Sequence, residues 1–487
     1  MPKQPSSTAL ARRTLFLASA GAALATTLPR RAAAAVSPVM TTLSAYMAAA
    51  AERPLPDDVV EKAKQHILDT FAAMISGSDL PPARAALKFV GGYAGDTTAT
   101  IAASTMTANP LEAALVNGML AHSDETDDSN EYSQSHPGCA VIPAALAVGE
   151  KLGADGAHFL RAVTLGYDVG PRVTISFGAV EFRDNSHKAT HAIAGIFAAA
   201  AAAGSLAKLD AQQMRWLLDY TAQQSSGIGA WARDTSHIEK SFVFAGMSAR
   251  SGVTAALVVQ SGFTGVDDIF SGPDNYFEAY APDAKPDLLI EQLGERYEIG
   301  RTNIKKWTVG SPIQAPLDAM ANIFAEHPVD PDQVKSIVVR LAHTEARTVN
   351  NREMPDICLQ HMVAVMLLDK TASFRAAHDK PRMDDPAVLR QRAKVQLIED
   401  PELQKLEPAR QSIVEITLND GVVLRNRVTA VRGTVDNPMP RAEVIAKARD
   451  LCEPVIGKPQ VDAMIEKVFA LETLPDIRAL RSVLQKS

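Results

Sequence analysis

The chain has 487 residues, of which 46% are hydrophobic and 22% charged, and its formal net charge is -7. This length suggests two or three domains, and this composition is that of a globular protein, which excludes compositional disorder. The negative charge, with no long basic run beyond the N-terminus, argues against nucleic acid as the main partner. The three cysteines, Cys139, Cys358 and Cys452, are too few for a disulfide framework or a cysteine-rich zinc site.

Residues 1–35 have the pattern of an export signal. Arg12 and Arg13 precede an apolar run that extends to Leu28, and alanines at 33–35 offer a cleavage site. Paired arginines are typical of the twin-arginine route. The apolar run of about 15 residues is shorter than the ~20 needed to span a bilayer; an uncleaved N-terminal anchor is the alternative. We expect no other spanning segment, and therefore a periplasmic mature protein without stable membrane insertion.

Residues 40–285 have a helical period. Apolar side chains recur at three- and four-residue steps from Val59 to Ile75. Asp210 with Gln213 resembles a capping box that opens a further helix. A βαβ alternation, a GxGxxG motif and a Walker loop are all missing from this segment. The sequence therefore predicts a large all-helical domain.

Residues 290–440 have a mixed pattern that predicts a smaller α+β domain. The segment 334–341 is rich in β-branched residues, and 413–418 alternates before Asn-Asp-Gly turn chemistry and a partner strand at 422–428. Helical stretches are expected near 312–326, 356–369 and 386–397. A helical pattern returns over 441–487. The predicted fold class is thus mainly α, with C-terminal helices that return to the large domain.

The densest polar cluster runs from His122 to His136 and holds two histidines and five carboxylates, Asp124, Glu125, Asp127, Asp128 and Glu131. An apolar helix precedes it and another helical run follows. A loop braced in this way can hold a base near a substrate. One alternative is an acidic solvated loop with capping aspartates. Another is a metal site of His122, Asp124, Asp127 and His136, although the spacing matches neither HExxH nor an EF-hand.

A second cluster contains His187 and His191, which would share a face if this segment were helical. Both precede an alanine-rich helix, whose N-terminus attracts carboxylates. The alternative is one structural and one exposed histidine. The cations Lys240, Arg250, Arg301, Lys305 and Lys306 are further candidates, although each taken singly is more typical of a surface charge. Signals for a nucleophile are weak, because GxSxG is missing and no cysteine lies in an activating motif.

In their order along the chain, several short motifs resemble the MmgE/PrpD family over roughly residues 40–480. The anchors are His66 to Phe71; Asn117-Gly118 through His122, Asp127-Asp128 and His136-Pro137; Thr190 to Gly195; Lys240 before a glycine- and alanine-rich helix; Met354 to Ile357 with Gln360-His361; and Asn437-Pro438.

This resemblance implies a large all-helical domain with a smaller α+β lid, usually in a homodimer. It also implies a cleft for small polycarboxylates and proton transfer next to a carboxylate, without a metal or other cofactor. In such chemistry a neutral histidine takes the proton and cations stabilise the developing charge. The implied site assigns general acid/base to His136, orientation to His122, Asp127 and Asp128, a further histidine to His191 or His187, and substrate binding to Lys240, Lys306 and His361.

The sequence also departs from better-known members of this family. Glu125-Thr126 stands where the cis-aconitate decarboxylases have Asp-Phe, and the loop up to His136 is one residue longer. A histidine expected shortly after Trp307 is missing, because Gly310, Ser311 and Gln314 stand there, and His361 replaces an expected tyrosine. Since these positions sort substrates, neither 2-methylcitrate nor cis-aconitate follows from the resemblance.

We expect a cofactor-free, dehydratase-like lyase that acts on a small di- or tricarboxylate. An epimerase, isomerase or decarboxylase of the same family would use the same proton abstraction. A carboxylate-binding protein without turnover and a metal-dependent hydrolase are the alternatives from other classes.

Overall fold

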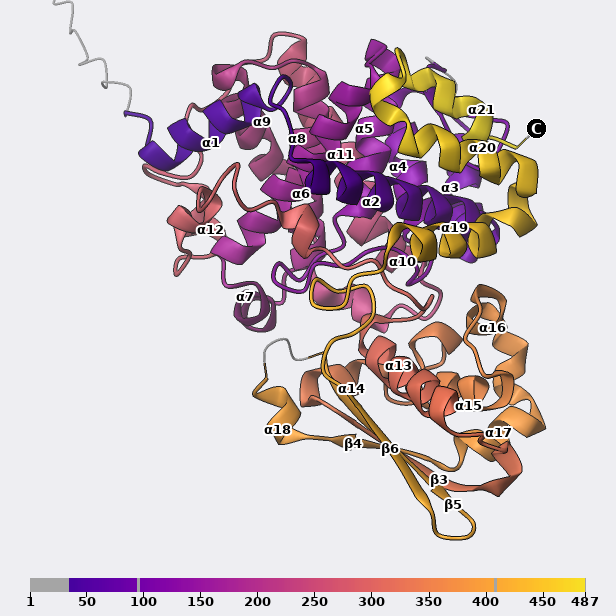
Figure 1. Cartoon of the computed structure of the whole chain (residues 1–487). Coiled ribbons are helices and arrows are strands. Elements are labelled where there is room, and N and C mark those ends of the chain that lie inside the picture. The colour runs from indigo at the N-terminus through magenta and orange to yellow at the C-terminus, as the bar shows by residue number, and fades with distance from the viewer. Residues whose placement is uncertain (1–34, 94–96, 407–409, 487) are drawn as a thin grey trace, which may run out of the picture. The chain divides into compact units, whose positions relative to one another are not determined.

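The computed structural model describes residues 35–93, 97–406 and 410–486 (Figure 1). The predicted export signal, apart from Ala35, lies outside the described residues. Helices dominate the described chain, and its main sheet has four strands. The predicted fold class, mainly α with a smaller α+β part, is confirmed.

The first part of the chain is built from helices. They are α1 (Pro38–Ala49), α2 (Asp57–Ser76), α3 (Pro81–Val90), α4 (Pro110–Ala121), α5 (Gly138–Leu152), α6 (Gly156–Ser176), α7 (Ala179–Ser186), α8 (Thr190–Leu206), α9 (Ala211–Gln224), α10 (Ile238–Ser241), α11 (Met247–Gln260) and α12 (Tyr276–Tyr280). Two short strands, β1 (Ala99–Thr100) and β2 (Thr107–Ala108), pair antiparallel and were not predicted. The predicted capping box at Asp210 and Gln213 is present at the start of α9.

The alanine-rich helix α8 lies at the centre of this part and contacts α5, α6 and α11. Its residues from Ala192 to Leu206 are buried, as close helix packing requires. Gly170 of α6 shows how tight the packing is, because a Cβ there would lie 2.3 Å from the carbonyl oxygen of Ala194. Small side chains therefore set the spacing of the helices that frame the polar loop described below.

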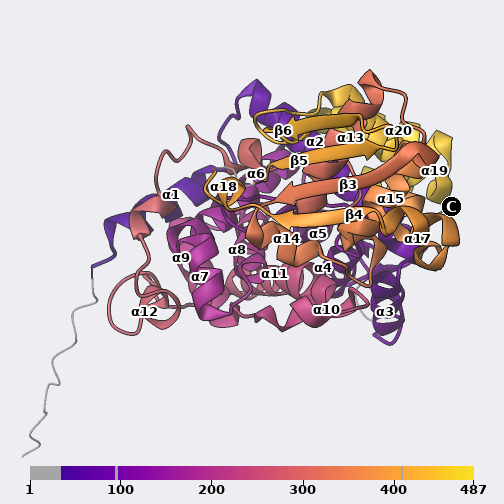
Figure 2. The same ribbon diagram turned by 90° about the horizontal axis from the view of Figure 1, so that it is seen from below.

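The later part of the chain holds the sheet and its helices. These are α13 (Ser311–Glu326), β3 (Val334–Leu341), α14 (His343–Val349), α15 (Leu359–Asp369), α16 (Phe374–His378), α17 (Pro386–Arg392), β4 (Val395–Glu399), α18 (Pro401–Gln404), β5 (Ser412–Leu418) and β6 (Val423–Val428). The strand order is β4-β3-β5-β6; β3 and β4 are parallel and the other pairs antiparallel. Figure 2 shows α13 and α15 behind this sheet, where they cover one face.

Two predictions for this region had different outcomes. The predicted strand over 334–341 and the hairpin over 413–428 are present. The helix predicted over 386–397 is present only in its first part, because α17 (Pro386–Arg392) ends at Arg392 and strand β4 begins at Val395. The helical pattern of the residues before Val395 hid the alternating pattern of the short strand that follows. The conformation of this strand is decided by its pairing with β3, in which Val395 lies opposite Ile337.

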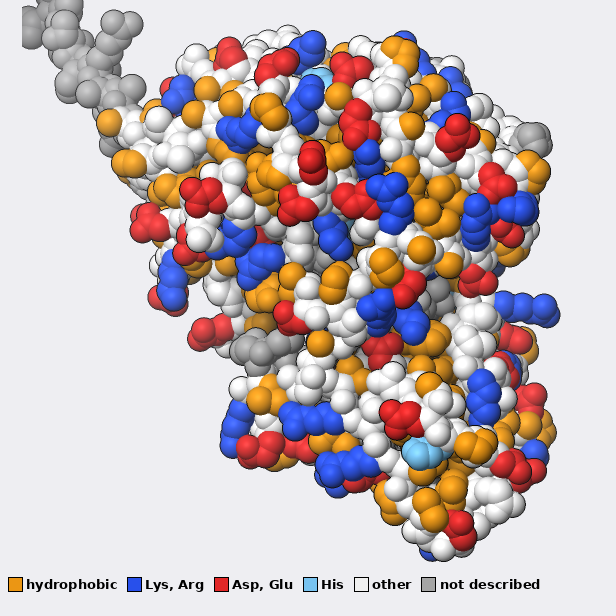
Figure 3. All heavy atoms as spheres, in the orientation of Figure 1, with side chains coloured by type: hydrophobic (Ala, Val, Ile, Leu, Met, Phe, Trp, Pro, Cys, Tyr) orange, Lys and Arg blue, Asp and Glu red, His pale blue; other side chains and the backbone are white. Residues whose placement is uncertain are grey.

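The last helices, α19 (Arg441–Ile456), α20 (Lys458–Phe469) and α21 (Arg481–Leu484), pack back on the first part of the chain. α19 contacts α2, and Lys447 of α19 pairs with Asp69 of α2 at 2.7 Å. One hydrophobic core joins the first and last helices, whereas a second core, which includes Trp307 and Val431, belongs to the α+β part. In the view of Figure 3, acidic and basic side chains are intermixed on the surface.

One helical run, Ile238–Gln260, is long and apolar enough by length and composition to cross a membrane, contrary to our expectation. It consists of α10, a π-helical segment Phe242–Gly246 and α11. Since 56% of its most apolar window is buried inside the fold, and α11 packs against α4 and α8, it has the character of a core helix.

Candidate active site

The acidic loop lies between the end of α4 and the start of α5 and is buried. Asp124, Glu125, Asp127 and Asp128 are each no more than 4% exposed. The alternative of a solvated acidic loop is therefore wrong. Antiparallel bridges hold the loop, and one of them joins Ser129 to Asn303 across a long stretch of sequence. Burial of so many carboxylates requires a cationic or hydrogen-bonding partner for each of them.

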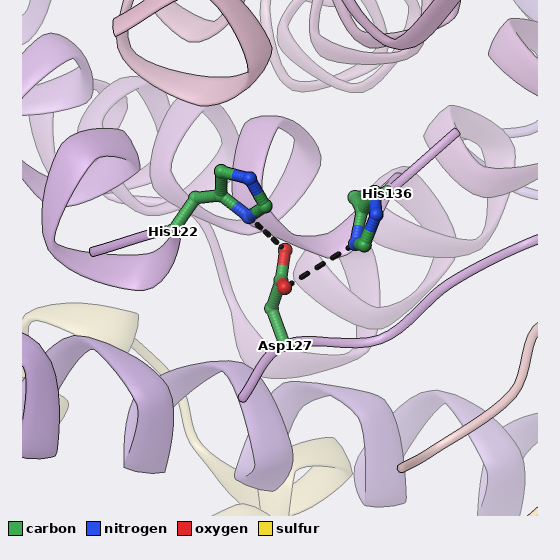
Figure 4. Close-up of side chains that lie close together, drawn as sticks. All are labelled: His122, Asp127 and His136. Atoms are coloured by element: carbon green, nitrogen blue, oxygen red, sulfur yellow. Dashed lines mark hydrogen bonds and ion pairs between the residues drawn. The ribbon is translucent and has the colours of Figure 1, made fainter. Parts of the chain in front are cut away.

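Asp127 lies between two imidazoles (Figure 4). Its Oδ2 is 2.9 Å from Nδ1 of His122 and accepts a hydrogen bond there, and its Oδ1 is 3.2 Å from Nδ1 of His136. This arrangement favours a proton on Nδ1 of each ring, which leaves Nε2 free to take one. Asp127 is thus placed to orient His136 and to stabilise its charged form.

Asp128, which we had predicted beside it in the same role, points elsewhere. It accepts hydrogen bonds from Tyr167 at 2.5 Å, from the backbone N–H of Gly138 at 3.0 Å, and from Nδ1 of His66 at 2.8 Å. Tyr167 and His66 belong to helices α6 and α2. The carboxylate of Asp128 therefore anchors the start of α5 and is not among the residues that line the cavity described next.

His136, His191, Lys240 and Glu125 line one cavity of about 1400 Å³. The rings of His136 and His191 stack with centroids 5.3 Å apart, and His191 stacks on Phe244 at 4.0 Å. Phe244 lies in the π-helical segment Phe242–Gly246, which begins two residues after Lys240. A π-helical turn is frequent at functional sites because it re-aims side chains within a helix. Here it places an aromatic ring between the histidines and the lysine.

Glu125 pairs with two lysines at the inner end of the cavity. Its carboxylate contacts Nζ of Lys240, and Lys305 lies 3.7 Å from its Oε2. Lys305 is 3% exposed; it donates to the backbone carbonyl of Glu125 at 2.9 Å and lies 3.6 Å from Oδ1 of Asp127. Two ammonium groups and two carboxylates therefore balance each other around His136.

Burial and these charges shift the acidities of the site in opposite directions. Burial raises the pKa of Asp127, but His122, His136 and Lys305 outweigh it and hold that pKa well below its usual value. Burial also raises the pKa of Glu125, and Lys240 and Lys305 lower it further than burial raises it. Both carboxylates are consequently ionised at neutral pH and are weak bases.

The two cavity histidines have lowered pKa values. Burial lowers the pKa of His136, and the attraction of Asp127 opposes this effect. For His191, burial followed by repulsion from His136 and Lys240 lowers the pKa well below its usual value. Both imidazoles are therefore neutral at neutral pH, and His136 is the one with an anion behind it.

Three other predicted site residues have different positions. His187 lines the outer part of the cavity, but it ends α7 with a left-handed backbone (φ 58°) and so does not share a helix face with His191. Lys306 lies over the ring of Trp307 at 4.6 Å and is not among the lining residues. His361 is buried in α15 away from the cavity. The structure thus places Lys305, and not Lys306, at the site.

Two of the departures noted in the sequence lie close to this cavity. Ser311 lines it, whereas Gln314 is occupied by hydrogen bonds to the backbone of Trp307 and Val309. No described imidazole from this segment reaches the cavity.

Several site residues were missed by sequence reasoning. Glu125 was noted as a loop carboxylate and a departure but given no role, and Lys305 was a candidate cation that we did not assign to the site. His237, whose ring centroid is 5.2 Å from that of His122, and Phe244 had no sequence signal. Contacts between the loop and distant segments, which the sequence does not reveal, bring these four residues together.

Among the residues that the structure describes, two groups could hold a metal ion: His122, Asp127 and His136, and His122, Glu125 and His237, with ligand atoms within 4.8 Å of one another. The ammonium of Lys305 lies 3.6 Å from Asp127 and 3.7 Å from Glu125. A cation in either group would therefore be repelled by a fixed positive charge beside its carboxylate ligand.

The chain matches the models of a known family over most of its length. Residues 41–289 match the MmgE/PrpD N-terminal domain and residues 307–471 match the MmgE/PrpD C-terminal domain, so the chain belongs to the MmgE/PrpD family.

Named relatives include cis-aconitate decarboxylases from fungi and human. The chain is 25% identical over 456 residues to the cis-aconitate decarboxylase of Homo sapiens, with 88% of this chain and 91% of the relative covered. It is 23% identical over 467 residues to that of Aspergillus terreus (88% and 92% covered). A cis-aconitate decarboxylase-like protein of Aspergillus oryzae is 24% identical over 464 residues (88% and 94% covered). The chain is thus similar to these enzymes along almost their whole length.

Proposed function

We propose that the protein is a cofactor-free lyase that removes a proton next to a carboxylate of a small di- or tricarboxylate and eliminates a leaving group. The strongest support is that His136 and Lys240 line the same cavity, with Asp127 held behind His136. His136 would supply the base, Lys240 the cation, and Asp127 the negative charge that stabilises the protonated base.

His136 is the best candidate for the base. Glu125 lines the cavity too, but its pKa is held well below the usual value because Lys240 and Lys305 outweigh burial. The pKa of His191 is lowered by burial with no carboxylate to oppose it. A general base works best when its pKa is close to the operating pH. Asp127, 3.2 Å from Nδ1 of His136, would stabilise the imidazolium that forms.

Lys240 and Lys305 would stabilise the negative charge that develops when the proton leaves. Preorganised cations next to such a charge act strongly because the site is shielded from water. In the free protein Glu125 and Asp127 together neutralise both lysines, and Glu125 is the partner of Lys240. A substrate carboxylate that reaches Lys240 must therefore share this cation with Glu125, which favours acids that carry more than one charge.

Elimination is favoured over decarboxylation by the segment after Trp307. Ser311 offers a hydroxyl to the cavity, and Gln314 is occupied by backbone hydrogen bonds. The resemblance to the decarboxylases implies a histidine shortly after Trp307, and this chain has Gly310, Ser311 and Gln314 there instead. Epimerisation by the same base is the second candidate, because it needs no leaving group.

The test is incubation of the protein with a panel of short polycarboxylic acids in D2O, read by mass spectrometry and ultraviolet absorption. Loss of water with a new alkene absorbance supports the lyase. Deuterium uptake without a change of carbon skeleton supports the epimerase, and release of CO2 supports a decarboxylase. His136→Ala should abolish all of these signals while the fold is retained by circular dichroism; a near-normal rate would remove His136 from the mechanism.

We further propose that residues 1–35 direct export to the periplasm. A fusion of this segment to a reporter that folds before export should reach the periplasm. Replacement of Arg12 and Arg13 by lysine should retain the reporter in the cytoplasm, and unchanged export would contradict the twin-arginine assignment.

A further inference from the structure

Three arginines at the outer wall of the cavity have no acidic partner. Arg233, Arg347 and Arg352 all line the cavity, and no described carboxylate pairs with any of them. The other two arginines that line it behave differently. Arg183 pairs with Asp184 at 2.9 Å, and Arg410 lies 3.7 Å from Glu131 and 3.8 Å from Glu345.

One contact joins the two segments of the chain that carry these arginines. Arg352 donates to the backbone carbonyl of Ala232 at 3.2 Å, and Ala232 precedes Arg233 in the chain. Its other nitrogen donates to the carbonyl of Thr348 at 3.3 Å, next to Arg347 in α14. Backbone carbonyls thus orient one guanidinium without neutralising it, so three positive charges remain available at one wall.

A short path connects this wall to the reacting end of the cavity. Trp231 precedes Ala232, and Nζ of Lys240 lies 5.6 Å from the centroid of its ring. The Nε1 donor of Trp231 is buried and has no hydrogen-bond partner among the described residues. An unused buried donor between Lys240 and the arginines is costly unless a ligand accepts from it.

The cavity is also large for a small di- or tricarboxylate. Its volume of about 1400 Å³ exceeds the roughly 300–1,000 Å³ that usually encloses a drug-sized ligand. A short tricarboxylate at Lys240 and His136 would leave the outer wall unoccupied.

We propose that Arg233, Arg347 and Arg352 form a second anion subsite, so that the substrate is an elongated acid with a distal oxyanion, a carboxylate or a phosphate. This inference rests on the proposed function, which places the reacting carboxylate at Lys240. Guanidinium groups bind both kinds of oxyanion in a bidentate manner, and the chain between the two charged ends would lie along Trp231.

The test compares acids of different length by calorimetric titration of the mature protein. The probes are succinate, suberate (a longer dicarboxylate) and 6-phosphogluconate (an acid with a terminal phosphate). We expect at least one of the longer probes to bind more tightly than succinate. Arg233→Ala, which removes a side chain with no acidic partner, should weaken that probe about ten-fold or more and change succinate less than two-fold.

Matched variants separate the subsite from general charge and from folding. Arg183→Ala removes a paired cavity arginine and should leave the preference for the longer probe unchanged. Arg352→Lys keeps the charge but loses the bidentate geometry, and should weaken the longer probe. Preference for 6-phosphogluconate alone identifies a phosphate, and preference for suberate alone a carboxylate.

Two results would overturn the subsite in different ways. Equal affinity of all three probes, or an equal loss for all of them in Arg233→Ala, would refute the subsite and leave the proposed function standing. Failure of all probes and of the short polycarboxylates to bind would refute the proposed function itself.

Discussion

Replacement of Asp127 by asparagine removes one charge at the centre of the site and preserves the side-chain shape. The imidazolium of His136 would then form without the carboxylate that lies 3.2 Å from its Nδ1. Asparagine can also donate to Nδ1, which favours the tautomer with its proton on Nε2, and that tautomer cannot take the substrate proton. We therefore expect folded protein with strongly reduced turnover.

The size of the effect follows from the distance. Two unit charges 3.2 Å apart interact by about 5 kcal/mol at an effective dielectric constant of about 20. Lys305, 3.6 Å from the same carboxylate oxygen, offsets part of this attraction. A loss of roughly 3–4 kcal/mol of transition-state stabilisation corresponds to a rate lower by about a hundred- to a thousand-fold.

The pH profile distinguishes this mechanism from a general loss of structure. The pKa of His136 is lowered by burial, and Asp127 opposes that effect. Without Asp127 this pKa falls further, so the acidic limb of kcat/KM should move to lower pH. The rate of deuterium exchange into the substrate, measured across the acidic range for both proteins, gives this limb directly.

Asp128→Asn is the matched control, because this neighbouring carboxylate is equally buried and binds Tyr167, His66 and the backbone of Gly138. It should lower the free energy of unfolding and leave the acidic limb in place. A rate for Asp127→Asn within ten-fold of the unmodified protein, or an acidic limb that moves to higher pH, would refute the assignment.

Three further predictions concern the cations. Lys240→Ala should weaken binding of multiply charged acids by about ten-fold or more in calorimetric titration, whereas Lys306→Ala, outside the cavity, should not; equal affinity for both variants would exclude Lys240 as a substrate contact. Lys305→Met leaves two buried carboxylates less compensated and should lower the free energy of unfolding by about 3–5 kcal/mol in urea titration, against about 0.5 kcal/mol or less for Lys306→Met. Burial would lower the pKa of His378, but Asp124, 2.7 Å away, raises it to about 9. Stabilisation by this ion pair should thus be full below pH 6.5 and be lost as the pH rises through about 9, so the stability difference from His378→Gln should shrink over that range; a constant difference would contradict it.

Much of the fold is predictable because it depends on local patterns. The strand at 334–341 is rich in β-branched residues, the turn at Asn419-Asp420-Gly421 joins β5 and β6, and Asp210 opens α9 as a capping residue. Failures occur where distant pairing decides, as at β4, whose conformation depends on its parallel alignment with β3. The left-handed backbone at His187 is likewise set by its surroundings, because Gly229 donates to its carbonyl at 2.8 Å.

The site is less predictable, because neighbouring residues in the sequence point to different places. Asp127 and Asp128 look equivalent in the sequence, yet one meets two histidines of the site and the other anchors helix α5. The adjacent lysines also point to different places: Lys305 contacts Glu125, whereas Lys306 lies over the ring of Trp307. Residue type and spacing identify the loop, but the bridged backbone of the loop decides which of two adjacent side chains contacts the residues that line the cavity.

The charge balance explains how so many buried charges can coexist in one site. Lys240 and Lys305 are buried or nearly so, and isolated ammonium groups there would strongly destabilise the fold. Glu125 and Asp127 compensate them in the free protein, and burial keeps His136 neutral although Asp127 favours its charged form. In the proposed reaction each substrate carboxylate adds a negative charge to this balanced set, and removal of a proton adds another on the substrate, which the imidazolium of His136 and the nearby ammonium groups would offset. Glu125 and Asp127, which stabilise the free protein, would therefore also make the proposed site selective among acids. An acid gains binding energy only if its charged groups reach cations that these two carboxylates have not already neutralised.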